Sequence, residues 1–188
     1  MRKIFIDCGS HVGSSIDSFR LRHKDFEIFC FEPLKKFKKY HNRRGVKYYQ
    51  AAVWTSYGTI DFYEDKTCDI AQGSSILINK TSGKLDKKHP VTVECIDFSK
   101  WIESHFSIDD YIAVKMDIEG AEYEVLNKMI LDQTIGYIDD LYMEWHYHKI
   151  DMNPQIHEEL YNKVKGLVNL HLNPTERKRN SKPTEVWV

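Results

Sequence analysis

The sequence predicts an α/β fold: a doubly wound, mostly parallel sheet with helices on both faces. Three observations lead to this prediction. Short apolar runs that end in turns recur along the 188 residues, as is typical of buried parallel strands. Most of these runs are followed by segments with apolar residues at helical spacing. No internal repeat or linker divides the chain, so residues 1–188 are expected to form a single domain.

Seven apolar runs are predicted to be the strands of the main sheet. In chain order they are 3–8, 27–31, 46–53, 111–114, a strand within 137–146, 168–172 and 184–188. The last two are joined by a basic polar turn without a helix, so they are expected to pair antiparallel. Residues 59–63 are predicted to form a hairpin arm after the third strand, and residues 91–96 alternate like a further strand.

Helices are predicted between the strands, and their starting points carry capping signals. Pro33 suits the first position of a helix, and Asn153 and Pro154 begin another. Asp97 is expected to cap the helix that follows it. Right-handed crossovers then place such helices on both faces of a parallel sheet.

Residues 64–90 show little periodicity and contain no predicted element. A long insertion of this kind in a compact domain is usually a functional loop or lid. The alternative is a disordered surface excursion, and the sequence supports both readings about equally.

Composition and charge argue against several classes of protein. The formal net charge is −1, and the cationic clusters at 35–39, 43–44 and 177–182 are short, so nucleic acid is not an expected partner. No apolar run reaches the roughly 18 residues of a membrane span, and the N-terminal run stops at Asp7, too early for an export signal. The four cysteines lack zinc spacing, and buried free thiols in the cytoplasm are expected. They are Cys8, Cys30, Cys68 and Cys95.

The turn after the first strand reads Asp7-Cys8-Gly9-Ser10-His11-Val12-Gly13. It departs from the G-x-G-x-x-G dinucleotide fingerprint because His11 replaces the second glycine and would obstruct a pyrophosphate. Asp7 would also repel a phosphate, whereas it suits a cationic or amine-bearing ligand such as an amino acid–nucleoside hybrid. Glu32, at the end of the next strand, can accept hydrogen bonds from two ribose hydroxyls. The alternative is that Glu32 only interacts favourably with the positive end of the dipole of the helix that follows it.

A second polar group follows the fourth and fifth strands, which should bring it to one rim of the sheet. It comprises Asp117, Glu119, Glu122, Glu144 and His146. Three carboxylates within six residues exceed what helix capping needs, because like charges held close raise each other's pKa. One interpretation is a base site that takes a proton from a substrate hydroxyl. Another is a divalent cation site with Asp117, Glu144 and His146 as candidate ligands. The third is that Glu144 and His146 are hydrogen-bonded rim residues, the interpretation also favoured for His148.

In these motifs the sequence resembles the FkbM-type family of S-adenosylmethionine-dependent methyltransferases. The most specific shared run is Lys115-Met116-Asp117-Ile118-Glu119-Gly120-Ala121-Glu122. The other shared segments are 5–13, Phe31-Glu32-Pro33, Ala51-Ala52-Val53, Gly73-Ser74-Ser75, 92–97 and 142–146. The resemblance implies a Rossmann-like, seven-stranded sheet whose last strand is antiparallel. The sequence departs from the family pattern at His11, where asparagine is usual, and it lacks a helical extension before the first strand. Residues 64–90 or another subunit would then have to cover the substrate.

The resemblance also implies a cofactor, S-adenosyl-L-methionine, and assigns residues to it. Those expected to bind it are Asp7, Gly9, Ser10, His11, Gly13, Glu32, Pro33, Ala52 and Asp117. Asp117, Glu119, Glu144 and His146 are expected to be catalytic. Ser74, Ser75 and Glu119 are expected to contact the substrate.

The reaction that the resemblance implies is O-methylation of a hydroxyl on a small molecule or a sugar. The alternatives on the same fold are a nicotinamide-dependent oxidoreductase, which His11 disfavours, and a non-catalytic nucleoside-binding module. The acceptor, the base, any dependence on a divalent cation and the oligomeric state are left open by the sequence.

Overall fold

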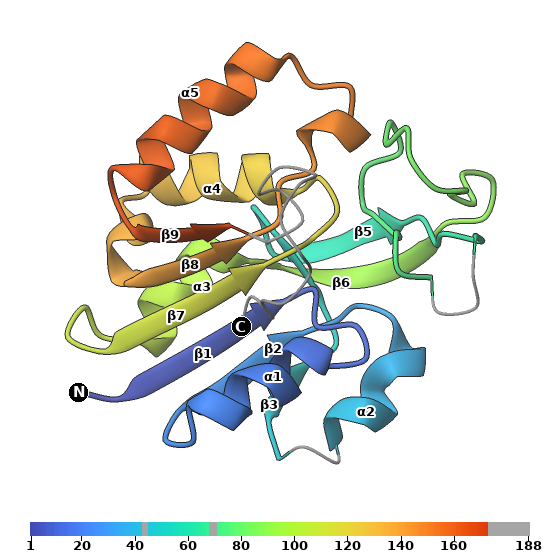
Figure 1. Cartoon of the computed structure of the whole chain (residues 1–188). Helices are drawn as coiled ribbons and strands as arrows, with labels where there is room; N and C mark the ends of the chain where they lie inside the picture. Colours follow the sequence, from blue (N-terminus) through green and yellow to red (C-terminus); the bar gives the residue numbers. More distant parts are fainter. Residues whose placement is uncertain (43–44, 68–70, 173–188) are drawn as a thin grey trace.

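The computed structural model describes residues 1–42, 45–67 and 71–172, and it confirms a parallel α/β sheet (Figure 1). Six parallel strands form the main sheet in the order β3-β2-β1-β7-β8-β9. They are β1 (Lys3–Cys8), β2 (Glu27–Phe31), β3 (Lys47–Tyr49), β7 (Tyr111–Met116), β8 (Asp140–Met143) and β9 (Asn169–Leu172). The central strands β1 and β7 are buried on both faces, which is why they read as continuous apolar runs.

Helices cover both faces of this sheet, as predicted. They are α1 (Ser14–Arg22), α2 (Lys38–Asn42), α3 (Phe98–His105), α4 (Glu122–Leu131) and α5 (Pro154–Lys165). Alternate residues of β1 point to opposite faces. Phe5 stacks on Phe19 of α1 with ring centroids 3.8 Å apart. Ile4 and Ile6 belong to the core cluster on the other face, which α3, α4 and α5 complete.

The predicted capping residues at Asp97 and Asn153 are confirmed. The Asp97 carboxylate accepts a hydrogen bond from the backbone N–H of Lys100, and the Asn153 amide oxygen accepts one from Gln155. Pro33 was expected to open a helix, and that prediction is wrong by two residues. The chain stays extended at Leu34, because its N–H donates to the Glu32 carboxylate, and a 3₁₀ turn (η1, Lys35–Phe37) begins only afterwards.

The predicted third strand is two strands that lie in different sheets. β3 ends at Tyr49, and β4 (Ala52–Trp54) joins a second sheet with the order β4-β6-β5. The predicted hairpin arm is also wrong: β5 (Gly58–Phe62) pairs antiparallel with β6 (Val91–Asp97), which separates it from β4. The reason is apolar burial, since Val93 and Cys95 of β6 pack into one cluster with Ala52 and Phe62.

Some predictions fall outside the described residues: the antiparallel strand at 184–188, the basic clusters at 43–44 and 177–182, and Cys68. The other three cysteines are free and buried, as predicted. Among the described helices, none combines the length and the apolar character that a membrane crossing requires. The cytoplasmic location stays a prediction.

The described part of residues 64–90 is irregular but packs against the body of the protein. Two isolated bridges, Tyr63 to Ser75 and Asp65 to Leu85, brace it internally. Thr81 attaches it to a 3₁₀ turn (η3, Tyr147–Lys149): both its backbone N–H and its hydroxyl donate to the Lys149 carbonyl oxygen, over 2.7 and 3.0 Å. These contacts argue against a disordered surface excursion, and a functional role of the loop stays a prediction.

Candidate functional site

Four polar or turn-forming residues come directly after four neighbouring strands of the main sheet. Gly9 follows β1, Glu32 follows β2, Asp117 follows β7 and Glu144 follows β8. Because parallel strands end at the same edge, the order β2-β1-β7-β8 places these residues along one rim, where open α/β sheets bind ligands. The predicted convergence of the Gly9, Glu32 and Asp117 segments is therefore confirmed.

A buried lysine connects the first turn, residues 9–13 after β1, to the acidic rim, which consists of Asp117, Glu119, Glu122 and Glu144 with His146. Lys115 lies opposite Asp7 in the β1–β7 register, and its side chain is 4% exposed. Its ammonium lies 3.2 Å from Oδ1 of Asp7 and 3.3 Å from Oδ2 of Asp117, and it donates to the Gly9 carbonyl over 2.9 Å. Burial lowers the pKa of Lys115, but the two carboxylates outweigh it and hold the pKa above its ordinary value. Sequence reasoning gave Lys115 no role, although a lysine within an apolar strand was a usable signal.

Gly9 is required by the packing of the protein backbone itself. Its φ is +78°, and a Cβ on it would lie 2.0 Å from the carbonyl oxygen of Asp117. The first turn therefore rests directly on the end of β7. Asp7 lies beneath this turn with no exposed surface, and its other oxygen accepts a hydrogen bond from the Ser15 hydroxyl.

Glu32 is held by the same turn. Its carboxylate accepts hydrogen bonds from the backbone N–H of His11 at 3.0 Å and of Leu34 at 2.8 Å. The side chain is nearly buried, and burial raises its pKa from 4.5 to about 7, against the opposing effect of these two hydrogen bonds. The His11 backbone, with φ +47°, is thus part of the Glu32 site.

A buried histidine, His41, holds the turn after β1 in place. The sequence did not mark it as functional. Nε2 of His41 lies 2.9 Å from the His11 carbonyl oxygen and 3.2 Å from the Ser10 hydroxyl. Ser10 therefore points into the protein. Among the other predicted cofactor residues, Gly13 precedes α1 with φ +79°, and both Pro33 and Ala52 are buried. Their contacts with a cofactor stay predictions.

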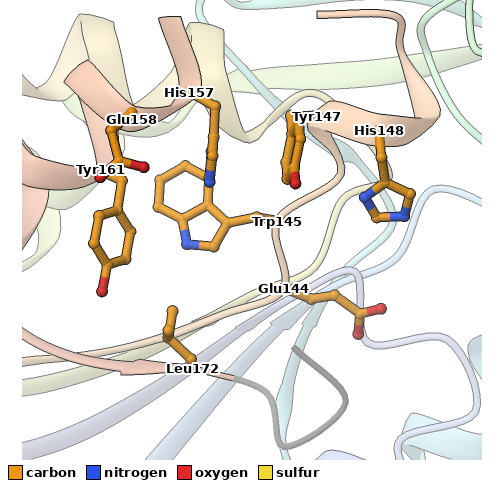
Figure 2. Close-up of a pocket in the computed structure, with 8 residues that line it drawn as sticks. All are labelled: Glu144, Trp145, Tyr147, His148, His157, Glu158, Tyr161 and Leu172. Atoms are coloured by element: carbon orange, nitrogen blue, oxygen red, sulfur yellow. The ribbon is translucent and has the colours of Figure 1, made fainter. Parts of the chain in front are cut away.

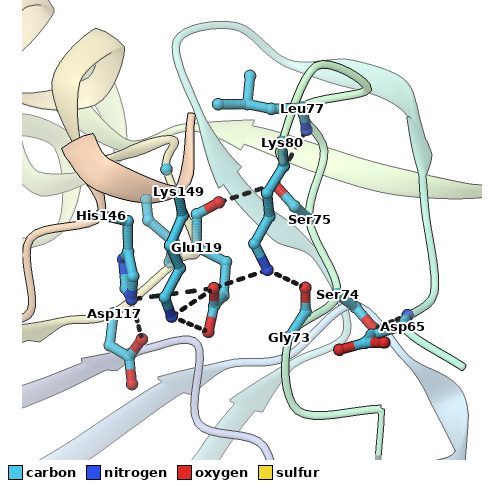
Figure 3. Close-up of polar contacts among 12 residues, drawn as sticks. Asp65, Gly73, Ser74, Ser75, Leu77, Lys80, Asp117, Glu119, His146 and Lys149 are labelled. Carbon is cyan, nitrogen blue, oxygen red and sulfur yellow. Dashed lines mark hydrogen bonds and ion pairs between the residues drawn. The ribbon is translucent and has the colours of Figure 1, made fainter. Parts of the chain in front are cut away.

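The acidic rim is arranged around His146, and Figure 3 shows Asp117 and Glu119 beside it. His146 has no exposed surface, and its Nδ1 lies 2.8 Å from Oε1 of the buried Glu122. The same Glu122 carboxylate accepts the backbone N–H groups of Ile118 and Gly120. Burial lowers the pKa of His146, but Glu122 and the neighbouring carboxylates raise it overall to about 10. Glu122 is thus the residue that holds the turn before α4 and orients the imidazole.

The other nitrogen of His146, Nε2, faces three carboxylates. It lies 3.8 Å from Asp117, 3.9 Å from Glu119 and 3.6 Å from Glu144. The structure thus brings together all four residues predicted to be catalytic. Burial raises the pKa of Asp117, and Glu144 adds to this effect while Lys115 opposes it.

Glu119 is also held by the loop at 64–90. Its carboxylate lies 2.8 Å from the ammonium of the buried Lys80 and 3.1 Å from that of Lys149 (Figure 3). Burial raises the pKa of Glu119, but His146 and the two lysines outweigh it, so the pKa lies below its ordinary value. Lys80 was missed in the sequence because nothing local marks it as buried.

The hydroxyls of the two serines predicted to contact the substrate form hydrogen bonds with the protein backbone. Ser75 donates to the backbone carbonyl of Glu119 at 2.9 Å, which supports the left-handed backbone there (φ +56°). Ser74 donates to the carbonyl of Ala71 and accepts from the N–H of Asp65. A direct contact of either serine with substrate stays a prediction, and the structure assigns both a structural role.

A pocket of about 540 Å³ opens beside Glu144 (Figure 2). Its lining is mostly aromatic and includes two carboxylates, those of Glu144 and Glu158. The lining residues are Glu144, Trp145, Tyr147, His148, His157, Glu158, Tyr161 and Leu172. Glu144 therefore belongs both to this pocket and to the carboxylates around His146.

Comparison with known proteins identifies the family. The model of the FkbM methyltransferase domain matches residues 7–174. No curated protein and no solved structure matches the chain. The match begins at Asp7 and includes all four strand ends of the site. It spans most of the sequence, so the chain belongs to the FkbM family of methyltransferases.

Proposed function

We propose that the protein is an S-adenosylmethionine-dependent O-methyltransferase that acts on a hydroxyl of a small molecule, with sugars among the acceptors. The observation that supports this most directly is the contact between the two halves of the site. Lys115 contacts Asp7, Gly9 and Asp117, so a nucleoside-type turn and an acidic cluster lie side by side. A group-transfer enzyme needs this arrangement, because donor and acceptor must meet in a fixed geometry.

On the cofactor side, Glu32 is the residue proposed to hold the ribose. Its oxygens each accept one backbone hydrogen bond, and a carboxylate oxygen can accept a second from a ribose hydroxyl. Asp7 is fully buried, so its proposed role is to hold the turn through Lys115 and Ser15. A methyl donor held by these residues would supply its methyl group on the side of the acidic rim.

On the acceptor side, the proposed entry is the pocket in Figure 2, and the proposed base is Glu144. S-adenosylmethionine, when bound, would supply the methyl group: its carbon–sulfur bond would break, with the electron pair left on sulfur, as a carbon–oxygen bond forms to the acceptor. The hydroxyl proton passes to the Glu144 carboxylate. Orientation of the two reactants supplies most of the acceleration in such an in-line displacement.

Isothermal titration calorimetry with S-adenosylmethionine tests the cofactor assignment. Loss of hydrogen bonds to a charged group costs about 1.5–3 kcal/mol, so Glu32→Gln should weaken binding roughly 10-fold to 100-fold. Glu27→Gln is the matched control, because Glu27 is the first residue of β2, at the end of the strand away from Glu32, and is exposed. Equal affinity of the wild type and the Glu32 variant would refute the assignment.

Methyl transfer itself is tested with labelled S-adenosylmethionine and a panel of sugars, phenols and aliphatic alcohols. The expected products are S-adenosylhomocysteine and a methylated hydroxyl, identified by mass spectrometry. Binding without transfer to any acceptor would favour the alternative of a nucleoside-binding module. Thermal stabilisation by a nicotinamide cofactor but not by S-adenosylmethionine would favour the oxidoreductase alternative, which membership in a methyltransferase family already disfavours.

A further inference from the structure

Nε2 of His146 is a buried nitrogen without a hydrogen-bond partner among the described residues. The three carboxylates that it faces lie at 3.6 to 3.9 Å, beyond hydrogen-bond distance. A buried polar atom that is left unpaired costs about 1–3 kcal/mol, so it calls for an explanation. None of the three carboxylates hydrogen-bonds to the imidazole, and all three surround the same nitrogen, Nε2.

The opposite side of the imidazole is firmly held. The hydrogen bond between Nδ1 and Glu122 aims Nε2 at the carboxylates, and Glu122 is itself held by two backbone N–H groups. Histidines that bind metals almost always donate their other ring N–H to a carboxylate or carbonyl, which sets the tautomer and the ring orientation. His146 has this arrangement.

We propose that His146, Asp117 and Glu119 bind a divalent cation, and that the Glu144 carboxylate lies beside this site. One ligand atom from each of the first three residues lies within 4.8 Å of the others. Two ligand atoms on one metal, each bonded at about 2.0–2.2 Å, lie roughly 3–4.4 Å apart, so the observed distances require only a small contraction. One imidazole with carboxylates suits a transition cation such as Mn²⁺ better than Ca²⁺, which prefers oxygen ligands alone.

The lysines around the cluster shape this site. Oδ2 of Asp117 faces Lys115, whereas its Oδ1 faces His146 and stays available. Glu119 contacts both Lys80 and Lys149. Lys80 is almost fully buried, but the Lys149 side chain is 23% exposed, so Lys149 is the ammonium that the cation displaces.

The existence of the site does not depend on methyl transfer, whereas its use does. In the proposed enzyme the cation would hold the acceptor hydroxyl beside Glu144 and lower its pKa, and this role rests on the proposed function. The experiment below therefore measures the cation alone, without cofactor or acceptor.

The full chain is freed of metal with a chelator and titrated with MnCl₂ by calorimetry and pulsed electron paramagnetic resonance. One tight Mn²⁺ per chain is expected, with magnetic coupling to an imidazole nitrogen. His146→Gln should abolish the coupling and weaken binding about 10-fold or more, the loss typical even for a partner that only orients a ligand. His89→Gln is the control, because His89 also lies beside a carboxylate, that of Asp86, but on the exposed surface.

Two further variants keep the test decisive if His146→Gln does not fold. Lys149→Met should tighten Mn²⁺ binding because it removes the competing ammonium, and Asp117→Asn should weaken it. The proposal is overturned by a lack of saturable Mn²⁺ binding, or by binding that neither the His146 nor the Asp117 change affects, which would indicate an adventitious ion only. A titration with S-adenosylmethionine on the same sample separates this outcome from a failure of the proposed function.

Discussion

The ammonium of Lys115 lies 3.2 Å from the carboxylate of Asp7, across two central strands, and both side chains are almost completely buried. Neither group is an exposed surface charge that water could screen. Breaking this pair is therefore costly, because it leaves a buried charge without its partner.

Lys115→Met should destabilise the protein by about 3–5 kcal/mol, since it leaves the Asp7 carboxylate buried and unpaired. Urea denaturation followed by circular dichroism measures this loss. Adding Asp7→Asn to the lysine change should recover part of it. Lys66→Met is the control: Lys66 pairs with Glu64 at the surface, where such a pair is worth about 1 kcal/mol or less. Equal losses in the two lysine variants would contradict the prediction.

Gly9→Ala should cost about 2–5 kcal/mol, which combines the strain of a left-handed backbone with overpacking against the Asp117 carbonyl. Gly45→Ala separates these effects, because Gly45 also has a positive φ (+59°) but no atom lies within 4 Å of its Cβ position. The Gly45 change should cost only about 1–2 kcal/mol. Thermal unfolding of the two variants gives the comparison, and similar melting temperatures would contradict the importance of the Gly9–Asp117 contact.

The affinity for S-adenosylmethionine should rise as the pH increases through about 7, the pKa to which burial brings Glu32. Only the ionised carboxylate is free to accept hydrogen bonds from both ribose hydroxyls. Calorimetric titrations between pH 5.5 and 8.5 should show the rise, and Glu32→Gln should remove it. A pH dependence that survives in the variant would assign the titration to another group.

The same pKa predicts the direction of a stability effect. The folded state holds the Glu32 proton more tightly than the unfolded chain does, because the pKa rises from 4.5 to about 7. The contribution of Glu32 to the free energy of unfolding therefore decreases as the pH rises between these values and is constant above them. Comparing the wild type with Glu32→Gln by urea denaturation at pH 5 and pH 8 isolates this contribution.

Glu144→Gln should lower kcat by about 10²–10⁴-fold, the range of a lost general base, and leave S-adenosylmethionine affinity unchanged. Glu158→Gln is the control, because Glu158 lines the same pocket but comes from α5, away from the His146 cluster. Steady-state kinetics on the acceptor found in the panel provides the test. Full activity of the Glu144 variant would show that Glu144 is not the base and that another group of the acidic rim must take the proton.

Lys80→Met should loosen the loop at 64–90, because Lys80 connects it to Glu119 and also donates to the Gly73 carbonyl. Faster proteolysis of the loop and a higher KM for the acceptor are expected, with no change in cofactor affinity. Lys84→Met, an exposed lysine of the same loop, should leave both unchanged. If both variants are cleaved at the wild-type rate, the ion pair does not hold the loop.

The sequence was most informative about features set by local periodicity. Buried strands such as 3–8 and 111–114 were predicted because their residues are apolar on both faces, and the end of each strand could be inferred from the turn that follows. The rim of the sheet follows from those ends, which is why the grouping of Asp117, Glu119, Glu144 and His146 was predictable.

Features that depend on contacts between distant segments could not be predicted. The pairing of Lys115 with Asp7 depends on the β1–β7 register, which spans 108 residues of chain. Lys80 and His41 are buried by tertiary packing, and their local sequences resemble solvated polar surface. β5 was assigned to the wrong partner because its apolar contacts come from β6, far away in the sequence.

The close approach of Gly9 to Asp117 also has a kinetic consequence. No side chain separates the turn at Gly9 from the end of β7, so a shift of one is expected to move the other. In the proposed enzyme, donor binding at this turn would then set the position of the acidic rim before the acceptor arrives. The two substrates should add in compulsory order, donor first, and S-adenosylhomocysteine should inhibit competitively against the donor and not against the acceptor.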